Sequence, residues 1–368
     1  MTNNYIGSIT KYILLFFLLT IIGCTFNDDS SINRKVVKVY PSLETTPVYR
    51  WGDDADDMAI WIDEDNMSNS FIIGALKKEG IALYNLNGEM FRFYSSGLFN
   101  NVDVRYNYKT NNGTIDLVAA TDRRFNGMVL FRIDKINRRL IPIATSTPKL
   151  KMKVYGLCMY HNKDNDNYYI FVTSKSGLIE QWKIVNSDKI ELNYVRKLKL
   201  KSQVEGCVSD DEYGYLFVSE EERGLWKYNI REQGNLKPVL VDSADKGGYL
   251  SEEVEGVTIY YSKGGSGYII VSSQGADRFD IYNRKPPHKY VGSFKIVDNY
   301  KDKIDGVSHT DGCDVINQSI NNKFPYGFFI AQDDKNTMPD GHQNFKLVAW
   351  ENIAKELNLI VDINYKYW

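Results

Sequence analysis

Six short apolar runs in this chain each end in a small residue and a polar or charged tip. The first three tips carry cations, and the next three carry carboxylates or an amide. In chain order they are Lys77 with Lys78, Arg123, Lys175, Glu220 with Glu221, Gln274 and Asp333. A second series of acidic residues or a tyrosine precedes the same runs, at Asp57, Asp103, Tyr155, Glu205, Glu255 and Asp311, with Asp56, Glu253 and Asp314 close by.

These residue types together indicate phosphate chemistry at a metal site. Clustered carboxylates repel one another unless they are protonated or bound to a cation. Ligands made only of oxygen select hard cations, so calcium is the natural candidate. Lysine and arginine on the facing side suit a multiply charged anion, above all phosphate. A metal arc facing a basic arc is typical of phosphoryl transfer.

The alternative interpretation is that each of these side chains is a solvated strand tip. Glu-Gly and Asp-Gly are ordinary turn pairs, and the run Glu220–Glu222 could be a solvated loop. The spacing argues against this interpretation. Two series of six positions recur in step, and in the first series the cations come from three consecutive repeats and the carboxylates or amide from the other three.

The elements that must position these residues are repeated antiparallel strands. The apolar residues at 73, 118, 172, 218, 271 and 330 mark a repeat of propeller-blade size. Strand-and-turn patterns cover residues 56–94, 101–133, 154–198, 204–230, 253–297 and 305–350, with a strong hairpin signal at Asn87-Gly88, and a helical pattern occurs only at 352–357. We therefore predict an all-β fold, a single six-bladed β-propeller with antiparallel blades around a central channel. A hairpin brings the start of its first strand beside the end of its second, so both series should lie at one mouth.

Composition and the N-terminal segment bound the remaining possibilities. The 368-residue chain has a net charge of −2, which excludes a bulk-charge argument for nucleic-acid binding. Residues 12–22 form an apolar run that is too short to span a bilayer stably and is typical of a signal sequence. Ile21-Ile22-Gly23-Cys24 resembles a bacterial lipobox, which implies cleavage before Cys24 and lipidation of its sulfur. An ordinary secretory signal that contains a cysteine is the alternative.

The predicted organisation is a signal peptide at 1–23, a lipidated tether at 24–40 and the propeller at 41–368. The expected protein is an exported bacterial lipoprotein, monomeric, anchored through Cys24 at the periplasmic face or the cell surface. Cys158, Cys207 and Cys313 each stand in an apolar context at a strand start, and three cysteines cannot form a full disulfide set. We predict that they are buried small apolar residues. Zinc spacings are lacking, and four scattered histidines argue against a histidine-rich metal site.

At these residues the chain resembles the β-propeller phytases, the alkaline calcium-dependent phytases, over about residues 45–355. The segments that carry the resemblance are Ala55–Trp61 (ADDMAIW), Asn100–Tyr106 (NNVDVRY), Val154–Gly156 (VYG), Asp210–Gly214 (DDEYG), Glu255–Tyr261 (EGVTIYY), Ser272–Gly275 (SSQG) and Gln343–Lys346 (QNFK). The resemblance implies hydrolysis of myo-inositol hexakisphosphate (phytate) as its calcium complex, by a 3-phytase-type phosphoric monoester hydrolase with several structural and active-site calcium ions.

The resemblance also assigns roles to residues. Phosphate would be held by Lys77, Arg123 and Lys175, with Lys78 and Arg124 as candidates for a neighbouring phosphate. Active-site calcium or the water between the ions would be bound by Asp56, Tyr155, Glu205, Glu221, Glu255, Gln274 and Asp314, of which Tyr155, Glu205, Glu221 and Glu255 form the predicted catalytic group. Glu253 and Asp311 belong to the predicted metal set, and Asp57 and Asp103 would serve structural calcium sites. Calcium-activated water would attack phosphorus in line, without a phosphoenzyme.

Three positions depart from the family pattern. Ser176 stands where the family has a glutamate, Glu253 stands where it has an aspartate, and His309 replaces an aspartate. These differences bear on the number and affinity of the active-site calcium ions. Two other functions stay open: a calcium-dependent propeller lactonase or esterase, which would not need the basic arc, and a non-catalytic lipoprotein that captures inositol phosphates.

Overall fold

The computed structural model describes residues 34–143, 150–187, 189–231 and 236–367. The predicted signal peptide, the lipobox with Cys24 and most of the predicted tether lie outside these residues. Among the helices of the described part of the chain, none has the length and apolar character needed to cross a membrane.

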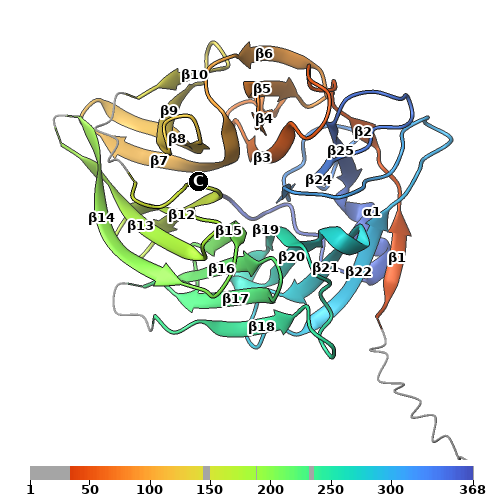
Figure 1. Cartoon of the computed structure of the whole chain (residues 1–368). Coiled ribbons are helices and arrows are strands. Elements are labelled where there is room, and N and C mark those ends of the chain that lie inside the picture. Colours follow the sequence, from red (N-terminus) through yellow and green to blue (C-terminus); the bar gives the residue numbers. More distant parts are fainter. Residues whose placement is uncertain (1–33, 144–149, 188, 232–235, 368) are drawn as a thin grey trace, which may run out of the picture. The chain divides into compact units, whose positions relative to one another are not determined.

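The regular secondary structure of the described residues consists almost entirely of antiparallel strands, arranged as six sheets (Figure 1). Blade 1 contains β3 (Ala55–Trp61), β4 (Phe71–Leu76), β5 (Gly80–Asn85) and β6 (Met90–Tyr94). Blade 2 contains β7 (Phe99–Thr110), β8 (Gly113–Asp122), β9 (Gly127–Asp134) and β10 (Arg139–Pro142). Blade 3 contains β11 (Leu157–Asn162), β12 (Asn167–Thr173), β13 (Leu178–Asn186) and β14 (Ile190–Lys199).

The second half of the chain repeats the arrangement. Blade 4 contains β15 (Val204–Asp210), β16 (Tyr215–Glu220), β17 (Gly224–Asn229) and β18 (Val239–Ser243). Blade 5 contains β19 (Val254–Tyr261), β20 (Gly267–Ser273), β21 (Arg278–Asn283) and β22 (Tyr290–Ile296), and β1 (Val36–Val39) adds to it in parallel beside β22. Blade 6 contains β23 (Cys313–Ile316), β24 (Phe328–Asp333) and β25 (Asn344–Ala349), and its outermost strand is β2 (Leu43–Glu44).

The six innermost strands β3, β7, β11, β15, β19 and β23 contact one another in sequence, and β23 contacts β3 again, so the ring is closed. The early strand β2 pairs with the last strand β25 in blade 6, so segments from the start and the end of the propeller share one blade. The all-β, six-bladed prediction is therefore confirmed. The helical pattern is also confirmed, as α1 (Trp350–Leu357), which follows β25.

Six apolar clusters lie between the six pairs of adjacent blades. Strands such as β4 and β24 are buried along their whole length because a neighbouring blade covers each of their faces. Phe329 of blade 6, for example, packs edge-on against Phe279 and Phe294 of blade 5 with ring centroids 4.8 and 5.2 Å apart. Burial on both faces explains why these strands read as continuous apolar runs, whereas an exposed sheet would alternate.

The structure differs from the sequence predictions at both the cysteines and the tether. Cys158 of β11 and Cys207 of β15 are buried as predicted, but they form a disulfide, with Cα atoms 5.7 Å apart, which their interpretation as small apolar residues did not include. Cys313 is free and buried, as predicted. Residues 36–39, placed in the tether, form β1 and belong to the folded domain.

Candidate functional site

One register position recurs at the start of each inner strand, where a β-bulge interrupts the ladder. In blades 1, 2, 4 and 5 the register shifts between the residues on either side of this position, so two residues of the inner strand face one of its partner. The six residues at this position, here called the mouth ring, are Asp56, Asn100, Tyr155, Glu205, Glu255 and Asp311.

Glycine follows the mouth ring in blades 3 to 6 because the backbone of the next blade is too close for a side chain. A Cβ at Gly156 would lie 2.0 Å from the carbonyl oxygen of Glu205, and one at Gly206 would lie 2.1 Å from that of Glu255. The N–H of Gly256 donates to the carbonyl of Asp311 at 2.7 Å. The Glu-Gly and Asp-Gly pairs are thus close backbone contacts between blades, and they bring the mouth-ring side chains together.

Three glutamates of blades 4 and 5 converge at the mouth. Glu205, Glu221 and Glu255 each place a carboxylate oxygen within 4.8 Å of the other two. Glu205 accepts a hydrogen bond from Nδ2 of Asn100 at 2.5 Å and is hydrogen-bonded to Tyr155. Glu205 and Glu255 are buried, and Glu221 is half-buried. Like charges at this separation require a proton or a cation between them.

Burial and mutual repulsion shift the ionisation of this cluster. Burial, reinforced by the charge of Asp311, raises the pKa of Glu205 to about 7. Burial and the charge of Glu205 raise the pKa of Glu255 well above its usual range. Burial also raises the pKa of Glu221. In each case the cost of burying the negative charge is larger than the stabilisation from nearby cations.

Lys77, at the tip of β4, enters the same group from the seam between blades 6 and 1. Its Nζ lies 2.6 Å from carboxylate oxygens of Asp53 and Asp311 and 3.6 Å from one of Asp56. Burial alone would lower the pKa of Lys77, but Asp56, Asp311 and Glu205 together raise it above its usual value. The expected basic and acidic sides of the mouth therefore meet here in direct ion pairs.

The other predicted cations reach the mouth from blades 2 and 3. Arg123 donates from Nη2 to the carbonyl of Lys77 at 2.8 Å. Lys175 lies with its Nζ 4.4 Å from the centroid of the Tyr155 ring, in a cation–π contact. Lys77, Arg123 and Lys175 thus flank the glutamate cluster on its blade 1 to 3 side. Lys175 and Arg123 are exposed and can reach a ligand in solvent.

The chemistry of the donor set fits a hard cation. Neither carboxylate oxygen of Asp56 has a hydrogen-bond partner, although the side chain is only 1% exposed. One oxygen each of Glu221 and Glu255 is also buried without a hydrogen-bond partner. Buried carboxylate oxygens without partners are costly unless they bind a cation. Asp56, Glu205, Glu221 and Glu255 could therefore hold calcium, which takes six to eight oxygen ligands.

Comparisons with known proteins identify what this site belongs to. The family model described as phytase matches residues 8–367. The 3-phytase of Bacillus subtilis (strain 168) is 40% identical over 337 residues, which cover 89% of this chain and 87% of that protein.

The chain belongs to the phytase family.

Solved structures resemble the enzyme only distantly. The crystal structure of BBS1N in complex with ARL6DN, soaked with lead, is 11% identical, with a TM-score of 0.47 over 79% of this chain and 78% of that chain. A functionally unknown protein from Desulfotomaculum acetoxidans DSM 771 is 12% identical, with a TM-score of 0.45 over 64% of this chain and 70% of that chain. Neither likeness bears on the function.

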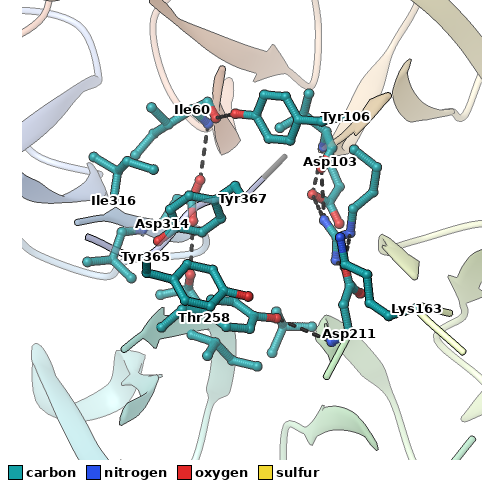
Figure 2. A pocket seen from close by; sticks show the side chains of 16 residues that line it. Ile60, Asp103, Tyr106, Lys163, Asp211, Thr258, Asp314, Ile316, Tyr365 and Tyr367 are labelled. Carbon is teal, nitrogen blue, oxygen red and sulfur yellow. Dashed lines mark hydrogen bonds and ion pairs between the residues drawn. The ribbon is translucent and has the colours of Figure 1, made fainter. Parts of the chain in front are cut away.

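Three of the predicted metal ligands of this phytase lie in the channel below the mouth. Asp57 turns away from the mouth and accepts hydrogen bonds from the side chain of Asn101 and the N–H of Val102. Asp103 and Asp314 lie deeper and line a cavity of about 90 Å³, on opposite sides in Figure 2. The prediction that Asp57 and Asp103 share the mouth with the other four members of their series was wrong.

Asp314 was also placed in the active-site set, and the structure places its side chain in the channel cavity below the mouth. It accepts hydrogen bonds from the N–H of Ile60 at 3.1 Å and from the hydroxyl of Thr258 at 2.9 Å (Figure 2). The residue that reaches the mouth is Asp311, three positions earlier, which binds Lys77 and the amide of Gln274, the latter at 2.6 Å. Burial raises the pKa of Asp314 to about 7.

The remaining predicted residues lie on the rim. Glu253, exposed, has a positive φ of 61° at the turn before β19, and Gln274 lies half-buried beside Asp311. Lys78 and Arg124 are exposed; the N–H of Lys78 donates to Asp54, and Arg124 pairs with Asp122. The side chain of Ser176 is hydrogen-bonded to Ser174, and His309 is exposed with an ion-pair partner, Asp277, at 3.7 Å.

Two further site residues were not predicted. Asn100 occupies the mouth ring in blade 2, with its side chain fully buried and its amide oxygen unpartnered. Gln203 donates to the hydroxyl of Tyr155 at 3.4 Å and is hydrogen-bonded to the carboxylate of Glu221. The Asn100 position was hidden because a neutral amide does not extend a series of charges, although its place two residues before Val102 matches that of Asp56 before Met58.

Proposed function

We propose that this phytase hydrolyses phosphate monoesters of phytate in a calcium-dependent reaction, with metal-activated water as the nucleophile and the calcium–phytate complex as substrate. The observation that carries the proposal is the convergence of Glu205, Glu221 and Glu255 within 4.8 Å beside Lys77, Arg123 and Lys175. A lactonase or esterase centre would need the oxygens but not the three cations.

The residues that would hold calcium are Asp56, Glu205, Glu221 and Glu255, with Asp311 and the Tyr155 hydroxyl at their edge. When bound, calcium lowers the pKa of water and offsets the negative charge of phosphate oxygens. Glu205 and Glu255 lie close enough to raise the pKa of Glu255, and both must be ionised to act as ligands.

The cations of the chain hold and orient the substrate. Lys77 places an ammonium 3.6 Å from Asp56, where a phosphate oxygen can take up its charge. Arg123 offers the planar fork of donors that suits a phosphate face. Lys175 closes the side near Tyr155, and Lys78 and Arg124 would hold a neighbouring phosphate. A substrate with adjacent phosphates should therefore be preferred over a simple monoester.

Phosphate release from phytate tests this function. The enzyme is assayed at neutral and mildly alkaline pH with calcium, with a chelator, and with calcium restored after chelation. We expect release with calcium, loss with the chelator and recovery on restoration. Equal rates with and without the chelator would exclude the calcium mechanism.

A second assay separates the substrate classes. The triple alanine variant of Lys77, Arg123 and Lys175 should lose phytate hydrolysis, whereas a lactonase or esterase activity would survive it. Affinity for phytate without turnover would instead identify a capture protein.

We also propose that the enzyme is exported as a monomeric lipoprotein anchored at Cys24. The support is the apolar run at 12–22 followed by Gly23-Cys24. Fatty-acid labelling of the wild type but not of a Cys24→Ser variant would agree with this, and labelling of both would exclude it. Light scattering of residues 34–368, which keep β1, tests the monomer.

A further inference from the structure

The disulfide between Cys158 and Cys207 joins the inner strands of blades 3 and 4 directly below the mouth. Cys158 comes three residues after Tyr155, and Cys207 comes two residues after Glu205. Among the described residues, no other disulfide joins two blades. The cross-link therefore sits under the pair of adjacent blades that carries Tyr155 and Glu205.

The backbone between these two blades is held at close range. The hydroxyl of Thr173 accepts from the N–H of Gly156 at 2.9 Å and donates to the carbonyl of Glu205 at 3.1 Å. A Cβ at Gly156 would lie 2.0 Å from that same carbonyl oxygen. Sliding of β15 against β11 would therefore move Glu205 against Tyr155, and the disulfide opposes this movement because it fixes the two strands covalently.

The side chains above the cross-link depend on that spacing. Glu205 is hydrogen-bonded to Tyr155 and to Glu255, and it accepts from Asn100 at 2.5 Å. It is the member of the cluster with partners in blades 2, 3 and 5. A displacement of Glu205 would disturb the whole set of oxygens at the mouth.

We propose that Cys158 and Cys207 are positioning residues, whose disulfide holds Tyr155 and Glu205 at the separation that calcium binding requires. The inference rests on the proposed calcium-dependent function. It makes the full activity of the enzyme depend on an oxidising compartment. The cysteines touch neither substrate nor metal, and they act through the two residues above them.

The test compares the Cys158→Ser/Cys207→Ser variant with wild type and with two controls. Cys313→Ser removes the free, buried thiol and leaves the disulfide intact. Leu140→Ala, on the outer strand β10, creates a cavity far from the mouth and controls for a general loss of stability. Each protein is assayed well below its unfolding temperature for kcat, KM for phytate, the calcium concentration for half-maximal activity, and terbium binding by luminescence.

We expect the double variant to need about tenfold more calcium or terbium for half-saturation, within the 10- to 100-fold range of lost outer-shell support. Its KM for phytate at saturating calcium should stay within about twofold, and kcat should fall. Cys313→Ser and Leu140→Ala should match wild type. Metal affinity in the double variant equal to wild type, or a loss of the same size in Leu140→Ala, would overturn the inference.

Reduction of the wild-type enzyme gives an independent reading without a substitution. Dithiothreitol transfers two electrons and two protons to the Cys158–Cys207 bond and is itself oxidised to its cyclic disulfide. Thiol titration counts the product, and oxidised glutathione re-forms the bond. We expect reduction to reproduce the weaker metal binding and reoxidation to restore it; a reduced enzyme with unchanged metal binding would overturn the inference. If wild type itself shows no dependence on calcium, the proposed function fails, which is a separate result.

Discussion

Replacing Lys77 by methionine removes one ammonium from the centre of the mouth and keeps most of the apolar stem. The lost charge lies 2.6 Å from Asp53 and Asp311 and 3.6 Å from Asp56. Asp53 is 66% exposed, so its pair with Lys77 contributes little. Asp311 and Asp56 are 15% and 1% exposed, so the variant leaves two largely buried carboxylates without their main partner.

The expected stability loss follows from those two carboxylates. Removing one partner of a buried pair costs roughly 3–5 kcal/mol. Burial already raises the pKa of Asp56 and Asp311, so protonation relieves part of the repulsion, and about 3 kcal/mol is the better figure. With an unfolding entropy of about 2.1 cal/mol/K for each of roughly 330 folded residues, the melting temperature in chelator should fall by about 4 °C.

Calcium should reduce this loss, because a bound cation faces the same carboxylates. Calorimetry of Lys77→Met and wild type, each in chelator and in saturating calcium, measures the difference. Phytate turnover by the variant should fall by about 10²- to 10³-fold, the usual cost of removing one charge-stabilising donor. The matched control is Lys323→Met, an exposed lysine bonded to the carbonyl of Ser42. Unchanged phytate turnover, or the same melting shift with and without calcium, would refute the reasoning.

Three other outcomes follow from the structure. Asp311→Asn should lower kcat/KM for phytate by about 10²-fold because Asp311 lies at the mouth. The channel variant Asp314→Asn should keep kcat/KM within about threefold of wild type. A larger loss in Asp314→Asn than in Asp311→Asn would show that the assignment of Asp311 to the active site is wrong. Burial and Lys227 lower the pKa of His288 to about 4, below its unfolded value near 6.5. Between these two pH values the unfolded state binds a proton that the folded state does not bind. The free energy of unfolding should therefore fall by up to about 3 kcal/mol as pH drops from 6.5 to 4. Denaturant titrations should show this slope in wild type and a flatter one in His288→Asn, whose residue tolerates the positive φ of 59°; equal slopes would exclude His288 as the source. Loss of the disulfide, which spans 49 residues, should cost about 4 kcal/mol and lower the melting temperature by roughly 6 °C, while an unchanged melting temperature would mean that the bond does not form in solution.

The blades and the convergence of their tips could be predicted from the sequence because both depend on local patterns. Asn87-Gly88 marks the hairpin between β5 and β6, where Gly88 has a φ of 84°, and buried strands read as apolar runs. The repeat then directs the strand tips toward one mouth. Glu220 and Asp333 are exceptions among the side chains, because Glu220 is buried against the backbone of Lys201 and Ser202 and Asp333 pairs with Lys346. The tips at Lys77 and Glu221 were located correctly for this reason.

The errors arise where one residue of register decides which way a side chain points. Asp56 and Asp57 are adjacent, and only the bulge in β3 determines that the first faces the mouth and the second faces the channel. In blade 2, Asp103 was assigned to the mouth instead of Asn100, because charged residues were used to define the series.

Other features depend on contacts between distant segments. The pairing of β1 with β22 joins residues about 260 positions apart, which no local pattern reveals. Which two of the three cysteines meet depends on the packing of blade 3 against blade 4, and each cysteine alone reads as a small apolar residue.

The central claim is that the oxygens of Glu205, Glu221 and Glu255 bind calcium at the mouth. Anomalous diffraction from crystals grown with calcium measures this directly. We predict anomalous peaks between these three carboxylates, with oxygen ligands at about 2.3–2.6 Å. A map without a peak among them, from an enzyme that releases phosphate from phytate at the same calcium concentration, would contradict it.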